Sequence, residues 1–380
     1  MRSRDSIAGI IKIFKEEYYR QRPPTGNILR TFGALEKCRT AALGGHIDKC
    51  PSCSHIAISY NSCRNRHCPL CQGREREKWI RNRKEDTLDV NHFHLVFTLP
   101  DHLNALFLFD KTKMYSLLFK AARQTIEYFA DAQGIQPGMT AMLHTWGSNL
   151  QFHPHLHCMI PAGGLDKEGK WKCFSNANNK NGYLFAVKAM SMVFRAKFMA
   201  ALTRLNPPEK SLRKKLFDNP WVVFCKRPLK VGDVIDYLGR YSHRIAISNR
   251  RIVEVSDTHV TFQYKDYKSE AAIKNMTIEG VEFLRRFALH ILPPGFVRIR
   301  HYGFMASCNK KKLQSAKNQT QKIKTEKNLD CSNSKEKKKD IDEPLRVNSF
   351  LCPICKKDYM VCLEIIPSIR APPKEISTYS

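Results

Sequence analysis

Six of the fourteen cysteines in this chain lie between Cys38 and Cys71, and this cluster constrains the fold more than any other feature. It contains two Cys-x-x-Cys pairs, Cys50/Cys53 and Cys68/Cys71, separated by fourteen residues. Such a pair places two thiolates on one tight turn, at the angle that tetrahedral Zn²⁺ requires. In a reducing compartment, clustered cysteines indicate metal ligands rather than disulfides. We therefore expect a zinc-binding module in the N-terminal part of the chain.

Two histidines extend the cluster to eight candidate ligands, which is enough for two zinc ions. The candidates are Cys38, His46, Cys50, Cys53, Cys63, His67, Cys68 and Cys71. One partition places Cys50, Cys53, Cys68 and Cys71 in one site and Cys38, His46, Cys63 and His67 in the other, although neighbouring ligands could be exchanged. Thiolate sites are closed, so the expected role of zinc is structural. Basic residues between the ligands, Arg64 and Arg66 among them, suggest that the module also contacts DNA.

A shorter cysteine group lies near the C-terminus, where Cys352-Pro-Ile-Cys355 is followed by Cys362. It could bind another zinc ion, with Cys331 as a candidate further ligand. The alternative is a half-site without metal in a loose tail, and the sequence does not choose between the two.

The net charge of +29 points to a polyanionic partner. Residues 309–343 carry eleven lysines against six acids, a net of +5, which leaves +24 on the rest of the chain. The body itself is therefore basic, and nucleic acid is the commonest partner of such a protein. A hydrophobic content of 42 % excludes a wholly disordered chain. No run of about 18 apolar residues exists, which excludes a membrane span. The N-terminus is a poor signal peptide because Lys12 interrupts its apolar run, so we expect a cytoplasmic protein.

Hydrophobic patterns along the chain predict an α+β protein with antiparallel strands. Residues 305–349 contain no aromatic residue and are rich in Lys, Asn, Ser and Gln, which is typical of disorder. Four parts are predicted: a helical segment with the zinc-binding domain at 1–90, a larger domain with a central antiparallel sheet flanked by helices at 91–305, a disordered basic linker at 306–349, and a cysteine-containing tail at 350–380.

Three histidines alternate along one predicted strand, His153, His155 and His157, and so point to one face of a sheet. Neighbouring imidazoles can hold a divalent metal, whereas the alternative is a row of histidines without a ligand. His92 and His94 have the same spacing and form a competing pair. Spacing alone does not choose between the two groups.

A hairpin supplies a candidate third ligand. If residues 148–151 form its turn, His144 lies opposite His155 with its side chain on the same face of the sheet. Three histidines would then converge and leave open metal positions for a substrate. Gln151 is a weaker candidate.

Tyr237 and Tyr241 are spaced to share one face of a helix, where half-buried aromatic residues are the usual finding. Arg240 and Arg244 lie beside them in the sequence, as phosphate ligands would. A tyrosine oxygen can attack phosphorus once a metal or a cation stabilises the charge that develops. The chain has no Gly-x4-Gly-Lys-Ser/Thr motif, so a P-loop motor is absent.

Taken together and in order, these motifs resemble the two-tyrosine rolling-circle transposases of bacterial insertion sequences, which belong to the HUH endonuclease superfamily. The resemblance runs from about residue 15 to 305. The matching segments are CRTAALGGH (38–46), NSCRNRHCPLCQ (61–72), HFHLVFTLP (92–100), LHTWG (143–147), HPHLHC (153–158), YLGRYSHRIAISN (237–249), VTFQYKDY (260–267) and EFLRRFALHILPPGFVRIRHYGF (282–304).

The resemblance implies that residues 91–305 form an HUH-type catalytic domain in a bacterial, cytoplasmic enzyme. It implies that His155 and His157 bind a catalytic Mg²⁺ or Mn²⁺, that Tyr237 and Tyr241 are nucleophiles, and that His92 and His94 lie beside the site. The implied reaction nicks and transfers single-stranded DNA at element ends through a 5′-phosphotyrosine, and a host helicase is expected to supply the unwinding. Two alternatives stay open: a rolling-circle plasmid replication initiator and a non-catalytic zinc-finger DNA-binding protein.

Overall fold

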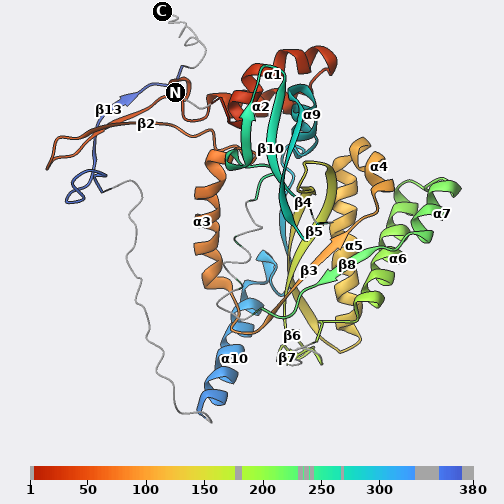
Figure 1. The fold of residues 1–380 in the computed structure, drawn as a ribbon. Helices are drawn as coiled ribbons and strands as arrows, with labels where there is room; N and C mark the ends of the chain where they lie inside the picture. Colours follow the sequence, from red (N-terminus) through yellow and green to blue (C-terminus); the bar gives the residue numbers. More distant parts are fainter. Residues whose placement is uncertain are drawn as a thin grey trace, which may run out of the picture.

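The computed structural model describes residues 4–175, 182–229, 234, 239, 244–266, 269–329 and 351–369, and it describes no side chains at 74, 82–86 and 324–329. These residues form three antiparallel sheets, and helices pack against the two larger-cored ones (Figure 1), so the predicted α+β class is confirmed. No described helix is long and apolar enough to cross a membrane.

The largest sheet has seven strands in the order β7-β6-β4-β5-β3-β8, with β12 also paired to β4. Its strands are β3 (His92–Thr98), β4 (Gln136–Trp146), β5 (Phe152–Pro161), β6 (Gly163–Leu165), β7 (Trp171–Cys173), β8 (Val222–Cys225) and β12 (Ile299–Gly303). The β4–β5 hairpin lies at its centre, as the sequence predicted. Leu150 closes the hairpin turn with a positive φ of 61°.

One face of this sheet forms the main hydrophobic core. Alternate residues such as Leu143 on β4 and Leu156 on β5 are fully buried against helices that follow or precede the strands. These helices are α4 (Asn104–Phe109), α5 (Lys111–Asp131), α6 (Val187–Leu205) and α7 (Lys210–Asp218). Asp110 caps α5 by accepting a hydrogen bond from the Lys113 backbone N–H at 2.9 Å. Because strand side chains alternate, the residues between these core positions face the opposite side of the sheet.

A second core joins the N-terminal helices to a segment more than 230 residues later. The helices α1 (Ile7–Gln21) and α2 (Gly26–Lys37) pack against α9 (Gly280–Leu289) and a three-stranded sheet. That sheet contains β9 (Ile252–Val255), β10 (His259–Asp266) and β11 (Ala272–Glu279). Phe14, Phe32 and Phe287 are all buried in this core. It therefore takes residues from both sides of the residue-90 boundary that the sequence predicted.

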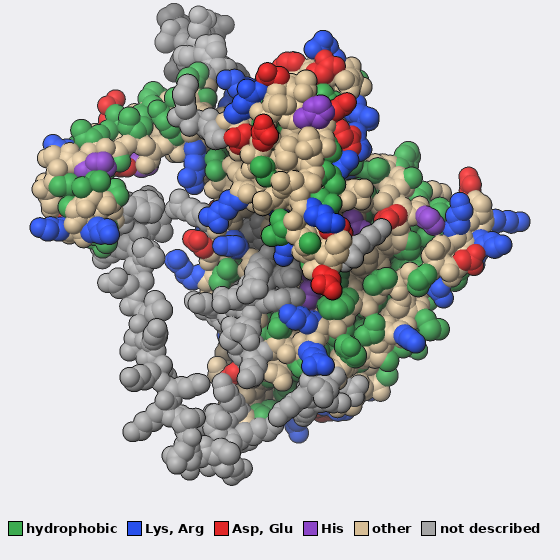
Figure 2. Space-filling model, in the orientation of Figure 1, with side chains coloured by type: hydrophobic (Ala, Val, Ile, Leu, Met, Phe, Trp, Pro, Cys, Tyr) green, Lys and Arg blue, Asp and Glu red, His purple; other side chains and the backbone are tan. Residues whose placement is uncertain are grey.

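The third sheet is small and has the order β13-β1-β2. It consists of β1 (Gly45–Lys49), β2 (Ile56–Tyr60) and the C-terminal β13 (Val361–Ile366). Figures 1 and 2 show that it extends from the body and carries many hydrophobic side chains on its surface. The long helix α3 (Pro69–Asp86) leads from this part of the chain to the central sheet, on the side opposite α5 and α6 (Figure 1).

The prediction of a disordered linker from residue 306 is wrong over its first half, because Lys310–Leu329 forms the helix α10. Leu313 and the buried Ala316 pack against Phe304 and Leu165, which anchors the helix on the body. Lysine-rich composition indicated disorder, but two apolar residues three positions apart on one helix face, Leu313 and Ala316, dock the helix. The rest of that segment, residues 330–350, lies outside the described residues.

Candidate functional site

Three histidines converge on the open face of the central sheet. His144 on β4 pairs directly with His155 on β5, which confirms the register predicted from the hairpin. His157 lies two residues further along β5. One nitrogen from each ring lies within 4.8 Å of the corresponding nitrogen of both other rings. We call His144, His155 and His157 the histidine triad.

Hydrogen bonds on the outer side of two rings orient them toward the centre of the triad. The Nδ1–H of His155 donates a hydrogen bond to the carbonyl oxygen of His153 at 2.7 Å. The other ring nitrogen of His155, Nε2, therefore keeps its lone pair. The Nδ1 of His157 lies 2.9 Å from Nε2 of His94, a buried histidine on β3. The two inner nitrogens, Nε2 of His155 and Nε2 of His157, are 3.2 Å apart. When His157 Nδ1 is the donor to His94, its Nε2 also has a lone pair, and a cation between the two inner nitrogens would be stabilised.

Burial keeps these rings neutral, as metal ligands must be. It lowers the pKa of His155 to about 4, and the positive charges of His153 and Arg244 contribute. The pKa of His157 is also far below its ordinary value, first through burial and then through its histidine neighbours and Arg244. Burial likewise lowers the pKa of His94 to about 4.

The donor set fits a divalent transition ion. The triad offers three imidazoles, and no carboxylate belongs to this group among the described residues. Mg²⁺ prefers oxygen ligands, whereas imidazole suits transition ions. Of the two ions that the resemblance implies, Mn²⁺ therefore fits this group better.

The other histidines and the glutamine considered for this metal do not join the triad. His153 lies on the same strand, but its Nδ1 lies 3.7 Å from an Asp101 carboxylate oxygen. The Nδ1–H of His92 donates to the Val90 carbonyl oxygen at 2.8 Å. Gln151 is exposed in the hairpin turn.

The cysteines form two tetrads whose membership differs from the predicted partition. Tetrad 1 is Cys38, Cys63, Cys68 and Cys71, and tetrad 2 is Cys50, Cys53, Cys352 and Cys355. The partition that joined Cys50 and Cys53 to Cys68 and Cys71 is wrong, because the C-terminal pair takes that place. Within tetrad 1 the measured Sγ–Sγ separations are 3.5 to 3.7 Å. Zn–S bonds of about 2.3 Å in a tetrahedron require about 3.8 Å, so the cysteines fit zinc.

The two predicted histidine ligands lie outside both tetrads, and His46 instead lies with Asp48 and Cys362 in a separate group that could hold a metal ion. The Nδ1 of His46 lies 2.7 Å from an Asp48 carboxylate oxygen, near Cys362. The Nε2 of His67 accepts a hydrogen bond from the Leu292 backbone N–H at 3.3 Å. Burial lowers the pKa of His67 to about 3, so the ring is neutral and can accept. Cys331 lies outside the described residues.

Of the predicted DNA-binding arginines, Arg64 is exposed in the loop between two tetrad 1 cysteines. Arg66 is half-buried, and its guanidinium donates to the carbonyl oxygens of Pro293 and Phe296 at 2.6 and 2.5 Å. It therefore joins the zinc module to the loop after α9 instead of standing free for DNA. Arg244 is exposed, and its charge acts on His155 and His157.

Tyr237, Tyr241 and Arg240 lie outside the described residues. Two of their neighbours are described. Val234 is buried against Met142 and Met159, which share the triad's face of the sheet, and against Trp79 of α3. Gly239 has a helical backbone and lies so close to Ile80 of α3 that a Cβ atom there would overlap that side chain.

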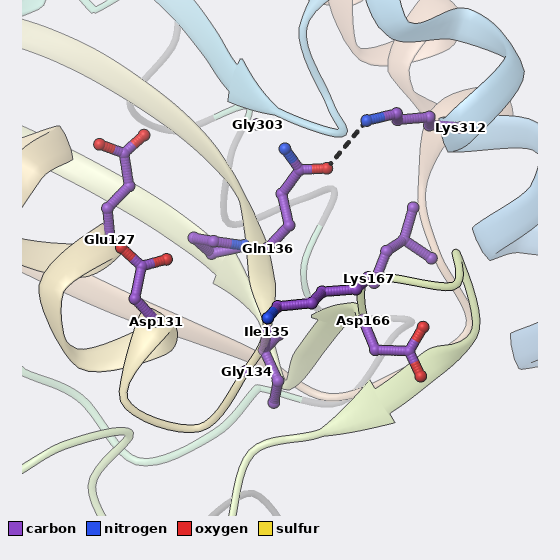
Figure 3. Close-up of a pocket in the computed structure, with 11 residues that line it drawn as sticks. Glu127, Asp131, Gly134, Ile135, Gln136, Asp166, Lys167, Gly303 and Lys312 are labelled. Carbon is purple, nitrogen blue, oxygen red and sulfur yellow. Dashed lines mark hydrogen bonds between the residues drawn. The ribbon is translucent and has the colours of Figure 1, made fainter.

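A separate pocket of about 570 Å³ lies at the far end of β4, beside Gln136 (Figure 3). Its charged lining consists of Glu127, Asp131, Asp166, Lys167 and Lys312. Three acids against two lysines would repel a DNA backbone. The pocket also contains no histidine or cysteine, so the triad is the better candidate for the reaction site.

Comparison with known proteins identifies the family of this chain. Residues 10–99 match the family model described as "Transposase zinc-binding domain", and residues 138–312 match the model described as "Putative transposase". The chain is 36 % identical to "Putative transposase y4qJ" of Sinorhizobium fredii, over 98 % of each chain. It is 30 % identical to "Transposase for insertion sequence element IS801" of Pseudomonas savastanoi pv. phaseolicola, over 73 % of this chain and 70 % of that one. No solved structure matches. The chain therefore belongs to the two-tyrosine rolling-circle transposases of insertion sequences, the family that its sequence motifs resemble.

Proposed function

We propose that this transposase nicks and rejoins single-stranded DNA at element ends, using Tyr237 and Tyr241 as nucleophiles beside a metal held by the histidine triad. The observation that carries the proposal is the convergence of three imidazoles on the open face of the central sheet. A Mn²⁺ or Mg²⁺ ion bound there would polarise the scissile phosphate. Relatives named as transposases favour this function over a plasmid replication initiator.

The described neighbours support the placement of the tyrosines. On a helix, positions 234, 237 and 241 share one face, because they are three and four residues apart. Val234 packs on Met142 and Met159, and Met142 is paired with His157 across β4 and β5. A helix oriented by Val234 would therefore direct both tyrosines toward the triad's face.

In the proposed reaction the tyrosine Oη forms a bond to phosphorus, and the bond from phosphorus to the 3′ oxygen breaks. The phenolic proton is lost to solvent, and the leaving oxygen takes up a proton to become a 3′-OH. The product is a 5′-phosphotyrosine, which keeps the energy of the phosphodiester so that rejoining needs no ATP. Arg244 would stabilise the charge that develops on the phosphate. The chain lacks a P-loop, so we propose that a host helicase supplies the single strand.

The test is a covalent adduct assay with labelled single-stranded oligonucleotides from the element's flanks and Mn²⁺. Each single change, Tyr237→Phe or Tyr241→Phe, is expected to spare cleavage and impair strand transfer. The double variant is expected to form no adduct that survives denaturation. Tyr128→Phe, at an exposed tyrosine on α5, is the control and should behave as the unaltered protein. An adduct in the double variant, or none in the unaltered protein, would overturn the proposal.

His94 is expected to orient His157 rather than to touch substrate. Replacing His94 with leucine removes the partner of His157 Nδ1, and loss of such a partner typically weakens metal binding about 10- to 100-fold. The Mn²⁺ concentration for half-maximal nicking should rise by that factor. The matched control is His92→Leu, since His92 is equally buried on the same strand and its ring contacts the Val90 backbone instead of the triad. Equal shifts in both variants would show a packing effect instead.

A further inference from the structure

We infer that tetrad 2 is a second structural zinc site, which ties the C-terminal segment of the chain to the N-terminal zinc module. Its four cysteines come from two turns about 300 residues apart, Cys50/Cys53 and Cys352/Cys355. The Sγ atoms of Cys50 and Cys355 are 3.6 Å apart, and those of Cys53 and Cys352 are 3.5 Å apart. These separations are too long for disulfides and close to the edge of about 3.8 Å of a zinc–thiolate tetrahedron.

The two turns have the same sequence pattern and the same backbone. Each reads Cys-Pro-x-Cys, and the next residue has a positive φ, 57° at Ser54 and 54° at Lys356. In each turn the backbone N–H of that residue donates to the carbonyl oxygen of the first cysteine, at 2.9 and 3.0 Å. Matching turns that face one another are what a symmetric four-thiolate site requires.

Other contacts at the junction of the turns add little apolar burial. Ser52 Oγ lies 3.2 Å from an Asp358 carboxylate oxygen and joins the two turns. Beyond the turns, β13 pairs antiparallel with β1, and Gly45 lies opposite Ile366.

Hydrophobic burial does not explain why the C-terminal strand stays attached. Val361, Leu363 and Ile365 on β13 are 52 %, 59 % and 76 % exposed. A small sheet with so little core needs a metal or disulfides to be stable. Tetrad 2 supplies the four thiolates for that metal, and its ligands lie outside residues 91–305. The inference therefore does not depend on the proposed nicking reaction.

The two tetrads should differ in how readily they lose zinc. Cys38, Cys68 and Cys71 of tetrad 1 are at most 5 % exposed within the second core. In tetrad 2, Cys53 is exposed and Cys355 is partly exposed. A chelator should therefore remove the tetrad 2 ion first.

The test measures zinc per chain by elemental analysis on the full-length protein. We expect two zinc ions, one in the Cys352→Ser/Cys355→Ser variant, and biphasic release to a chelator whose fast phase is missing in that variant. Retention of one zinc shows that the variant still folds around tetrad 1. The control Cys308→Ser, at an exposed cysteine outside both tetrads, should keep two ions and both phases. Equal zinc content in the unaltered protein and the double variant would overturn the inference.

A second measurement follows the segment itself. A site-specific protease sequence is inserted between Lys338 and Lys339, and the cleaved protein is run on a native gel. The C-terminal fragment should stay with the body when zinc is bound and leave it after chelation or in the double variant. Departure of the fragment from the zinc-loaded protein would also overturn the inference.

Discussion

Replacing His157 with alanine is expected to lower the rate of DNA nicking about 1,000-fold, which corresponds to about 4 kcal/mol of transition-state stabilisation. His157 is the central member of the triad. Its Nε2 lies 3.2 Å from that of His155, and its ring centroid lies 4.5 Å from that of His144. Removing it takes away the ring that lies next to both other members of the triad and that His94 Nε2 contacts at 2.9 Å. Single-turnover cleavage of end-derived single-stranded DNA at saturating Mn²⁺ measures the effect.

The matched control for this variant is His153→Ala. Because strand side chains alternate, His153 lies on the same face of β5 as His155 and His157. Its ring is partly exposed and lies beside the Asp101 carboxylate instead of joining the triad. It should therefore nick at close to the unaltered rate. Both variants should retain the zinc content of the unaltered protein, because the triad lies far from the tetrads in the chain and shares no residue with them. Similar rates for His157→Ala and His153→Ala would rule out the triad as the metal site.

Hairpin geometry was enough to predict that His144 faces His155, whereas the choice of His155 and His157 over His92 and His94 came from the family resemblance. A short hairpin fixes which residues of its two strands face each other, so His144 could be placed opposite His155 before the fold was known. The role of His94 could not be predicted in this way. It depends on β3 being the neighbour of β5, and that pairing joins residues about 60 positions apart. The sequence offered His92 and His94 as equivalent, and only the register shows that His94 reaches His157.

The zinc ligands show the same limit more strongly. The sequence contains three Cys-Pro-x-Cys turns, at Cys50, Cys68 and Cys352, and any two of them could pair by chemistry. The nearest two were paired in the prediction because they lie fourteen residues apart. In the structure Cys68 and Cys71 instead lie with Cys63 and with Cys38, which follows the end of α2. Cys50 and Cys53 lie with the C-terminal pair, Cys352 and Cys355. Chain closure over about 300 residues costs about 2.7 kcal/mol more than over fourteen residues. That is small beside the roughly 10 to 16 kcal/mol of structural zinc binding, so separation is a weak guide.

The second large effect is expected at tetrad 1, where Cys68→Ser should unfold the second core. Cys38, Cys68 and Cys71 are buried beside Ile10 and Phe287, so this zinc ion joins α2 and α3 to the helices around α9. Structural zinc contributes about 10 to 16 kcal/mol of binding free energy in small zinc-finger peptides. Even a third of that would consume much of a domain's stability of about 5 to 15 kcal/mol. We expect the melting temperature to fall by at least about 10 °C.

The control for Cys68→Ser is Cys352→Ser, which removes the same kind of ligand from tetrad 2. Both serines replace a nearly fully buried thiolate, at 1 % and 0 % exposure, but only tetrad 1 lies within a hydrophobic core. Thermal unfolding followed by circular dichroism should show a large shift for Cys68→Ser and a shift of at most about 2 °C for Cys352→Ser. Equal shifts would mean that the C-terminal site also supports the body. No shift in either would mean that packing of α1, α2 and α9 holds the second core without zinc.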